Sequence, residues 1–193
     1  MNRIYYLLSK LRIHKKVVTK YINIRIKRQD QLFNSFDPSP FIEKDLDNDA
    51  IEYLVSYFEE YGLNEKIEIL IHLPKSQKRR TSEKIIKKGI HNYFEYKKDI
   101  ESHKIKKKLE SSRVSFIIGL MILISCMGLK YALVARLMNY SWASAILSEG
   151  LTIGGWVAMW KPMGEILYEW LPLKRDRDIY NKISEAQIEF IYE

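Results

Sequence analysis

Two apolar stretches separated by a three-residue turn constrain this chain more than any other feature. Residues 114–138 are apolar or small apart from Lys130 and Arg136, and residues 142–160 carry one charged residue, Glu149. About 20 helical residues cross a hydrocarbon core of about 30 Å, so each stretch is long enough to span a bilayer. Tyr and Trp border the stretches, which is typical of the membrane interface. We expect a two-helix transmembrane hairpin over residues 114–160.

Basic residues gather at one end of this hairpin and account for much of the net charge of +8. By the positive-inside rule, both termini are then cytoplasmic, and the protein is multi-pass. We expect a bacterial inner membrane, with anionic headgroups as the first partner of these residues. Nucleic acid is not an expected partner, because a basic helix that leads into a membrane meets headgroups first. The predicted headgroup contacts are Lys106, Lys107, Lys108, Arg113, Lys174 and Arg175.

The charged residues Lys130 and Glu149 lie inside the two apolar stretches. In an antiparallel hairpin that turns near Tyr140, they face each other close to the bilayer midplane. Placing either charge alone inside a membrane costs about 3 kcal/mol on insertion scales. We therefore predict that Lys130 and Glu149 form an intramembrane ion pair. Three interpretations stay open: a pair that fixes the hairpin register, an ion or proton pathway in an oligomer, or a span boundary that places Lys130 at the interface.

Small residues accompany both charges. Lys130 shares a helical face with Ser115, Gly119 and Cys126, and Glu149 shares one with Ala145, Ser148, Thr152 and Gly155. Small residues let two helices approach closely, so these faces should pack together. A different face of the second stretch carries Gly150, Gly154 and Ala158, a GxxxG pattern followed by another small residue. It predicts helix packing in a homo-oligomer.

The remaining segments predict a small cytoplasmic α/β module. Residues 20–28 and 65–73 read as strands, and a helix from Asp47 or Asp49 to Tyr61 lies between them and ends at Gly62. This βαβ unit should be parallel, and residues 186–192 should add a third strand. The fold class is an α+β membrane protein, a βαβ module plus C-terminal strand with an inserted transmembrane hairpin.

The expected parts are an amphipathic segment 1–18, lying on the core or the membrane; the βαβ part 19–80; a basic helix 81–113; the hairpin 114–160; an interfacial helical stretch 161–185, opening with a proline break; and the strand 186–193.

No catalytic motif, cofactor site or metal site is predicted. The acidic run after Pro40 resembles a calcium loop, but Ala50 and Ser56 occupy the positions of the required glycine and glutamate. The four His are scattered and Cys126 is the only cysteine. A ligand or partner site at the sheet edge is the alternative to turn capping for Asp37, Asp45, Asp47, Asp49 and His72.

We expect a non-enzymatic membrane-anchored sensor or adaptor, whose cytoplasmic module binds a ligand or protein partner while the spans oligomerise. The alternative is an oligomeric membrane-perturbing effector or small channel, with Lys130 and Glu149 along its pathway. In layout, a soluble module with two spans resembles the two-helix membrane effectors of bacterial antiphage systems. A third hypothesis is a membrane-associated enzyme that uses Asp37, the acidic run and His72.

Overall fold

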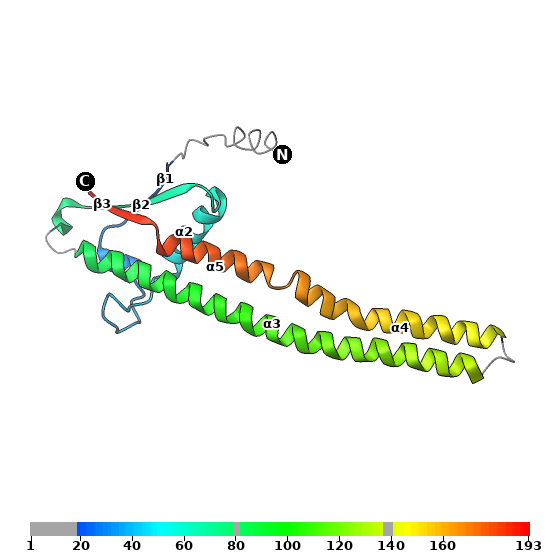
Figure 1. Cartoon of the computed structure of the whole chain (residues 1–193). Helices are drawn as coiled ribbons and strands as arrows, with labels where there is room; N and C mark the ends of the chain where they lie inside the picture. Colours follow the sequence, from blue (N-terminus) through cyan, green and yellow to red (C-terminus); the bar gives the residue numbers. More distant parts are fainter. Residues whose placement is uncertain (1–18, 79–81, 137–140) are drawn as a thin grey trace, which may run out of the picture. The chain divides into compact units, whose positions relative to one another are not determined.

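The computed structural model describes residues 19–78, 82–136 and 141–193, without the side chains of Val134 and Ser141 (Figure 1). The predicted amphipathic segment 1–18 lies outside the described residues. The chain divides into two compact units, which are described separately. The first contains the residues up to Phe94 together with Asn181–Glu193, and the second contains Glu95–Tyr180.

The first unit is built on a parallel sheet of three strands, in the order β1-β2-β3. The strands are β1 (Thr19–Arg25), β2 (Lys66–Leu73) and β3 (Gln187–Tyr192). Ile22 lies beside Ile69, which lies beside Ile188, so the alternating isoleucines of the sequence form one continuous row. The predicted parallel βαβ unit and the C-terminal strand are confirmed, although β1 ends at Arg25, before the predicted residue 28.

The connection from β1 to β2 contains the short helix η1 (Gln29–Leu32) and the helix α2 (Asn48–Tyr61). Asp47 is the N-cap of α2, because its side chain accepts a hydrogen bond from the Asp49 amide. Gly62 ends the helix at a φ of 77°, a backbone conformation that glycine adopts without strain. The predicted start and end of this helix are both confirmed.

The core lies on the isoleucine face of the sheet. Ile69 and Ile71 of β2 are 0% exposed, as is Phe58 of α2. The first turns of the helix α3 (Glu83–Arg136) cover the same face, since Glu83 accepts a hydrogen bond from Tyr192 and Lys87 lies over the Phe190 ring. At the other edge, Lys20 lies over the ring of Tyr61 in α2. Figure 1 shows these helices on one side of the strands.

Long helices make up the rest of the chain. After the short helix η2 (Lys75–Gln77), α3 runs from Glu83 to Arg136, α4 from Ser141 to Leu167 and α5 from Leu171 to Ser184, directly before β3. The predicted basic helix 81–113 and the first apolar stretch therefore form one continuous helix. In the described residues, the crossover between the parallel strands β2 and β3 contains η2, α3, α4 and α5 instead of the usual single helix.

The proline break predicted at residue 161 is wrong. Pro162 lies inside α4, which continues to Leu167 before the turn that precedes α5. Proline removes the helical hydrogen bond to the carbonyl of residue 158 and needs room for its ring. Gly119 of α3 provides that room: a Cβ there would lie 3.1 Å from both the Ala158 oxygen and the Pro162 Cγ.

The helices α3 and α4 are in contact along the predicted faces. A Cβ at Gly155 would lie 2.9 Å from Leu123 Cδ1 and 3.4 Å from Cys126 Cβ. Nearer the turn, the Lys130 ammonium donates a hydrogen bond to Thr152 Oγ1 at 3.0 Å. Rising numbers on α3 meet falling numbers on α4, so the two helices run in opposite directions. The small residues Gly119 and Gly155 lie at these contacts, and the transmembrane hairpin stays a prediction.

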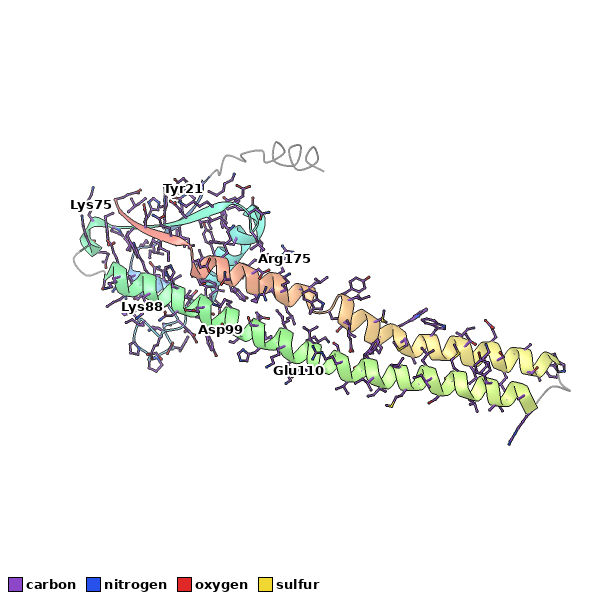
Figure 2. All side chains as sticks on the ribbon, in the orientation of Figure 1. Tyr21, Lys75, Lys88, Asp99, Glu110 and Arg175 are labelled. Atoms are coloured by element: carbon purple, nitrogen blue, oxygen red, sulfur yellow. The ribbon has the colours of Figure 1, made fainter. Side chains whose placement is uncertain are left out.

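The apolar parts of both helices are largely uncovered. Exposed side chains include Ile117 at 56%, Ile124 at 61%, Ile146 at 68% and Trp156 at 57%. Figure 2 shows side chains extending outward along α3 and α4. Within the described residues, α3 is the one helix long and apolar enough to cross a membrane: a window of it reaches a mean hydropathy of 2.1, with 6% buried.

Candidate functional site

The carboxyl ends of the three parallel strands meet at one edge of the sheet, where ligands of open α/β folds usually bind. Two adjoining depressions lie at this edge, and they share Arg25 and Ile26. The larger, which we call the β1 groove, has a volume of about 730 Å³. It is lined by Asn23, Ile24, Arg25, Ile26, Gln31, Leu32, Asp47, Asp49, Ala50 and Tyr53.

The β1 groove has the outer edge of β1 as one wall and the first turns of α2 as the other. Three consecutive residues of β1, which are Asn23, Ile24 and Arg25, line it together with Ile26, which directly follows the strand. Tyr53 reaches from α2 to the strand and donates a hydrogen bond to the Asn23 carbonyl at 3.0 Å. Asp49 is exposed at the rim. The groove therefore combines the edge of a strand with the acidic N-terminus of a helix.

The smaller depression, the carboxyl-end pocket, has a volume of about 200 Å³ and is lined by Arg25, Ile26, His72, Leu73, Pro74 and Glu193. His72 connects all three strands: Nδ1 lies 2.8 Å from Glu193 Oε1 and Nε2 lies 3.0 Å from Asn23 Oδ1. The side-chain amide of Asn23 can accept a hydrogen bond from a protonated Nε2 through its oxygen. If the amide is flipped, its nitrogen can donate a hydrogen bond to an unprotonated Nε2.

The acidic residues predicted as a site divide between two roles. Asp37 accepts hydrogen bonds from the amides of Asp45 at 2.7 Å and Ser39 at 2.9 Å. These bonds, that from Asp45 first, hold the pKa of the Asp37 carboxyl below its ordinary value. Asp37 is therefore engaged in capping its own loop. Asp37 and Asp45 line neither of these two depressions, and a site that joins them to His72 stays a prediction.

Asp47 and Asp49 do line the β1 groove, and His72 lies in the adjoining pocket. The structure thus brings together one part of the predicted site. Sequence reasoning missed Asn23, Arg25, Tyr53 and Glu193. Asn23 and Arg25 could be recognised only as the polar side of a strand, because their position at the free edge depends on the strand order β1-β2-β3. No group of three or more potential metal-ligating side chains occurs in the part of the chain that the structure describes.

The residues predicted as an intramembrane ion pair and as a helix-packing face lie on α3 and α4. The contact of Lys130 is with Thr152, and Glu149 is exposed three residues earlier on α4. Over the described ranges no ion pair joins these two residues, and their pairing stays a prediction. Gly150 and Gly154 have no atom within 4 Å of an added Cβ. Ala158 differs, since its carbonyl lies against Gly119 of α3.

The basic residues predicted to contact headgroups lie on α3 and α5. Lys106, Lys107 and Arg113 are exposed, as are Lys174 and Arg175. Lys108 instead forms an ion pair with Glu169 at 2.5 Å, and this hydrogen bond raises the pKa of the lysine. Lys174 Nζ lies 5.6 Å from the centroid of the Trp170 ring, a cation–π distance. Headgroup contact of this set stays a prediction.

Comparison with known proteins adds no relative. The chain matches no family model, no curated protein and no solved structure. The functional argument therefore rests on the residues and geometry of this chain alone.

Proposed function

We propose that this protein is a membrane-anchored adaptor whose three-stranded module binds a partner at the carboxyl edge of its sheet. The observation that carries the proposal is the connection of the sheet: β2 leads into α3, and α5 leads directly into β3. The chain thus connects β2 to the apolar helices through α3, and β3 to them through α5. A partner bound at this edge is therefore held by strands that are joined to the apolar helices. The cytoplasmic location of the module and a bacterial inner membrane belong to the same proposal.

The uncovered apolar surface of α3 and α4 supports the membrane part. Exposed contiguous apolar surface of this extent is rare in soluble monomers. Charged residues flank it in the sequence, with Arg113 on α3 and Lys161 and Glu165 on α4. From residue 114 to residue 135, α3 extends about 33 Å, which matches a hydrocarbon core of about 30 Å. We propose α4 as the second span, because it contacts α3 along this section.

Extraction from cell membranes tests the anchoring. Membranes that contain the full chain should be washed with alkaline carbonate and then with 1 M NaCl. We expect the protein to stay in the pellet through both washes and to dissolve only in detergent, because its attachment is apolar. Release by salt alone would contradict a transmembrane anchor and would indicate headgroup binding by the basic residues.

Site-specific photo-crosslinking in cells tests the adaptor role. Asp49, at the rim of the β1 groove, is replaced by p-benzoylphenylalanine. A matched replacement is made at Phe36, which is 94% exposed and lies outside both depressions. We expect a discrete crosslinked protein from position 49, identified by mass spectrometry, and none from position 36. Equal patterns from both positions would contradict a partner site at the sheet edge.

A small channel is the second candidate, and the half-buried Lys130 and the exposed Glu149 in the apolar section favour it. Intramembrane ionisable residues are expensive and often mark an ion pathway. In liposomes a channel should give an ion flux that Glu149→Gln changes. If the reconstituted protein gives no ion flux but still crosslinks to its partner, the channel is contradicted and the adaptor function remains.

A further inference from the structure

We propose that the β1 groove binds an extended peptide segment of a partner protein, which adds to the free edge of β1 as a fourth strand and carries a basic residue. This inference rests on the proposed adaptor function and specifies the chemistry of its partner. Three observations support it: the hydrogen bonding of β1, the side chains of α2 that cover part of its edge, and the charge of the groove.

The hydrogen bonding of the sheet decides which main-chain groups of β1 face outward. The Ile26 amide donates to the His72 carbonyl of β2, so Ile26 faces the sheet. In a strand, successive residues direct their N–H and C=O groups to opposite edges. Asn23 and Arg25 therefore face the free edge, in agreement with the hydrogen bond that the Asn23 carbonyl accepts from Tyr53.

The amino half of this edge is covered. Tyr53, Tyr57 and Tyr61 stack along α2 with ring centroids 4.9 and 5.7 Å apart. The first of them bonds to Asn23 and the last lies beneath the Lys20 ammonium. Proteins usually cover exposed strand edges, because an open edge pairs with other chains. Within the described residues, the stretch from Asn23 to Ile26 opens into the groove.

A groove between an edge strand and a helix is the geometry in which extended peptides bind by strand addition. Here the Arg25 N–H and C=O supply main-chain hydrogen bonds. Ile24, Leu32 and Ala50 supply apolar surface for one side of the peptide. A volume of about 730 Å³ is within the range of ligand sites and fits a few extended residues.

The charge of the groove selects the peptide. Asp47 and Asp49 at its α2 wall outnumber Arg25, the basic residue among its lining residues, and Asp49 is exposed. A lysine or arginine of the bound segment would form a charge-assisted hydrogen bond with it, whereas a glutamate would be repelled. The segment is thus expected to be extended, to have alternating apolar residues and to have at least one basic residue.

The probe is a fluorescein-labelled, C-terminally amidated hexapeptide of alternating lysine and valine, titrated into the full chain in detergent micelles. Two further peptides serve as arms: one with glutamate in place of lysine, and one whose amides facing β1 are N-methylated. We expect saturable binding of the first peptide and binding weaker by about tenfold or more for the others, because one loses the charge pair and the other its strand hydrogen bonds.

Variants locate the binding. Asp49→Asn should weaken binding of the lysine peptide several-fold, while the matched variant Glu110→Gln, an exposed acid of α3, should leave it unchanged. Amide hydrogen exchange should slow at Arg25 when the peptide is bound. Equal binding of the methylated peptide, or no slowing at Arg25, would overturn strand addition.

Failure of this inference is distinguishable from failure of the adaptor role. If no peptide binds but position 49 still crosslinks a partner in cells, the adaptor stands and strand addition is overturned. If Arg25 exchange slows with protein concentration and without peptide, the edge is taken by a second copy of this chain, which also overturns the proposal.

Discussion

Asp37 shows how a single carboxylate can order a loop rather than form a site. It accepts hydrogen bonds from two main-chain amides, those of Ser39 and Asp45, across a segment with two prolines and little regular structure. An aspartate in this position keeps the loop folded by local hydrogen bonds. The acidic run that suggests a ligand site therefore contains at least one residue whose bonding capacity is already used.

Asp37→Asn should lower the thermal midpoint of the first unit by a few degrees at pH 7, because a neutral amide accepts these bonds less strongly than a carboxylate. The pKa of Asp37 is lowered in the folded state, so its contribution is fully present above the ordinary value near 3.8. It is lost as pH falls through the folded pKa.

Circular dichroism melts at pH 7 and below pH 3 measure this effect. The difference between the native protein and Asp37→Asn should shrink on acidification. Asp45→Asn is the matched control, since the structure uses the Asp45 amide rather than its side chain in this bond. An equal loss from both variants would show that the carboxylate of Asp37 has no special role.

At the scale of elements, the sequence predicts what local patterns determine. Alternating isoleucines define β1 and β2, and Asp47 with Gly62 marks both ends of α2. The strand order and the β1 groove were not predictable, because they depend on how distant segments meet. Pro162 shows the limit of a local rule: a proline usually ends a helix, but Gly119 on another helix accommodates it.

The packing of α3 against α4 depends on Gly155. Gly155→Leu should force the helices apart, because even a Cβ there lies 2.9 Å from Leu123. Gly128→Leu is the matched control, since no atom lies within 4 Å of its added Cβ. Cysteines in place of Lys130 and Thr152, with Cys126→Ser, should crosslink in the control and much less in Gly155→Leu. Equal crosslinking would contradict the close approach at Gly155.

The face that carries Gly150 and Gly154 is open and is the predicted place for a neighbouring subunit. The double variant Gly150→Leu and Gly154→Leu should reduce the mass of the detergent-solubilised protein from an oligomer to a monomer, as measured by light scattering. Gly128→Leu, on α3, should keep the oligomer. A monomeric native protein would contradict the oligomer and remove the pore candidate with it.

At the scale of the whole molecule, the two compact units carry different chemistry. The first has a core in which Phe58, Ile69 and Phe94 are 0% exposed. The second has exposed apolar side chains along residues 114–160 and, outside that range, ion pairs such as Lys108–Glu169. A conventional core in one unit and an uncovered apolar surface in the other are what the proposed membrane anchor predicts.

Removal of residues 114–160, with a short Gly-Ser loop joining Arg113 to Lys161, tests this division. The ion pair between Lys108 and Glu169 lies outside the deletion and can still hold the helices together near the new loop. We expect a monomer that is soluble without detergent and melts cooperatively, because the sheet and its core are intact. The full chain should require detergent under the same conditions, since burial of its apolar side chains in lipid is worth about 25 cal/mol per Å². A full chain that stays monomeric and soluble in plain buffer would show that these helices do not need a membrane.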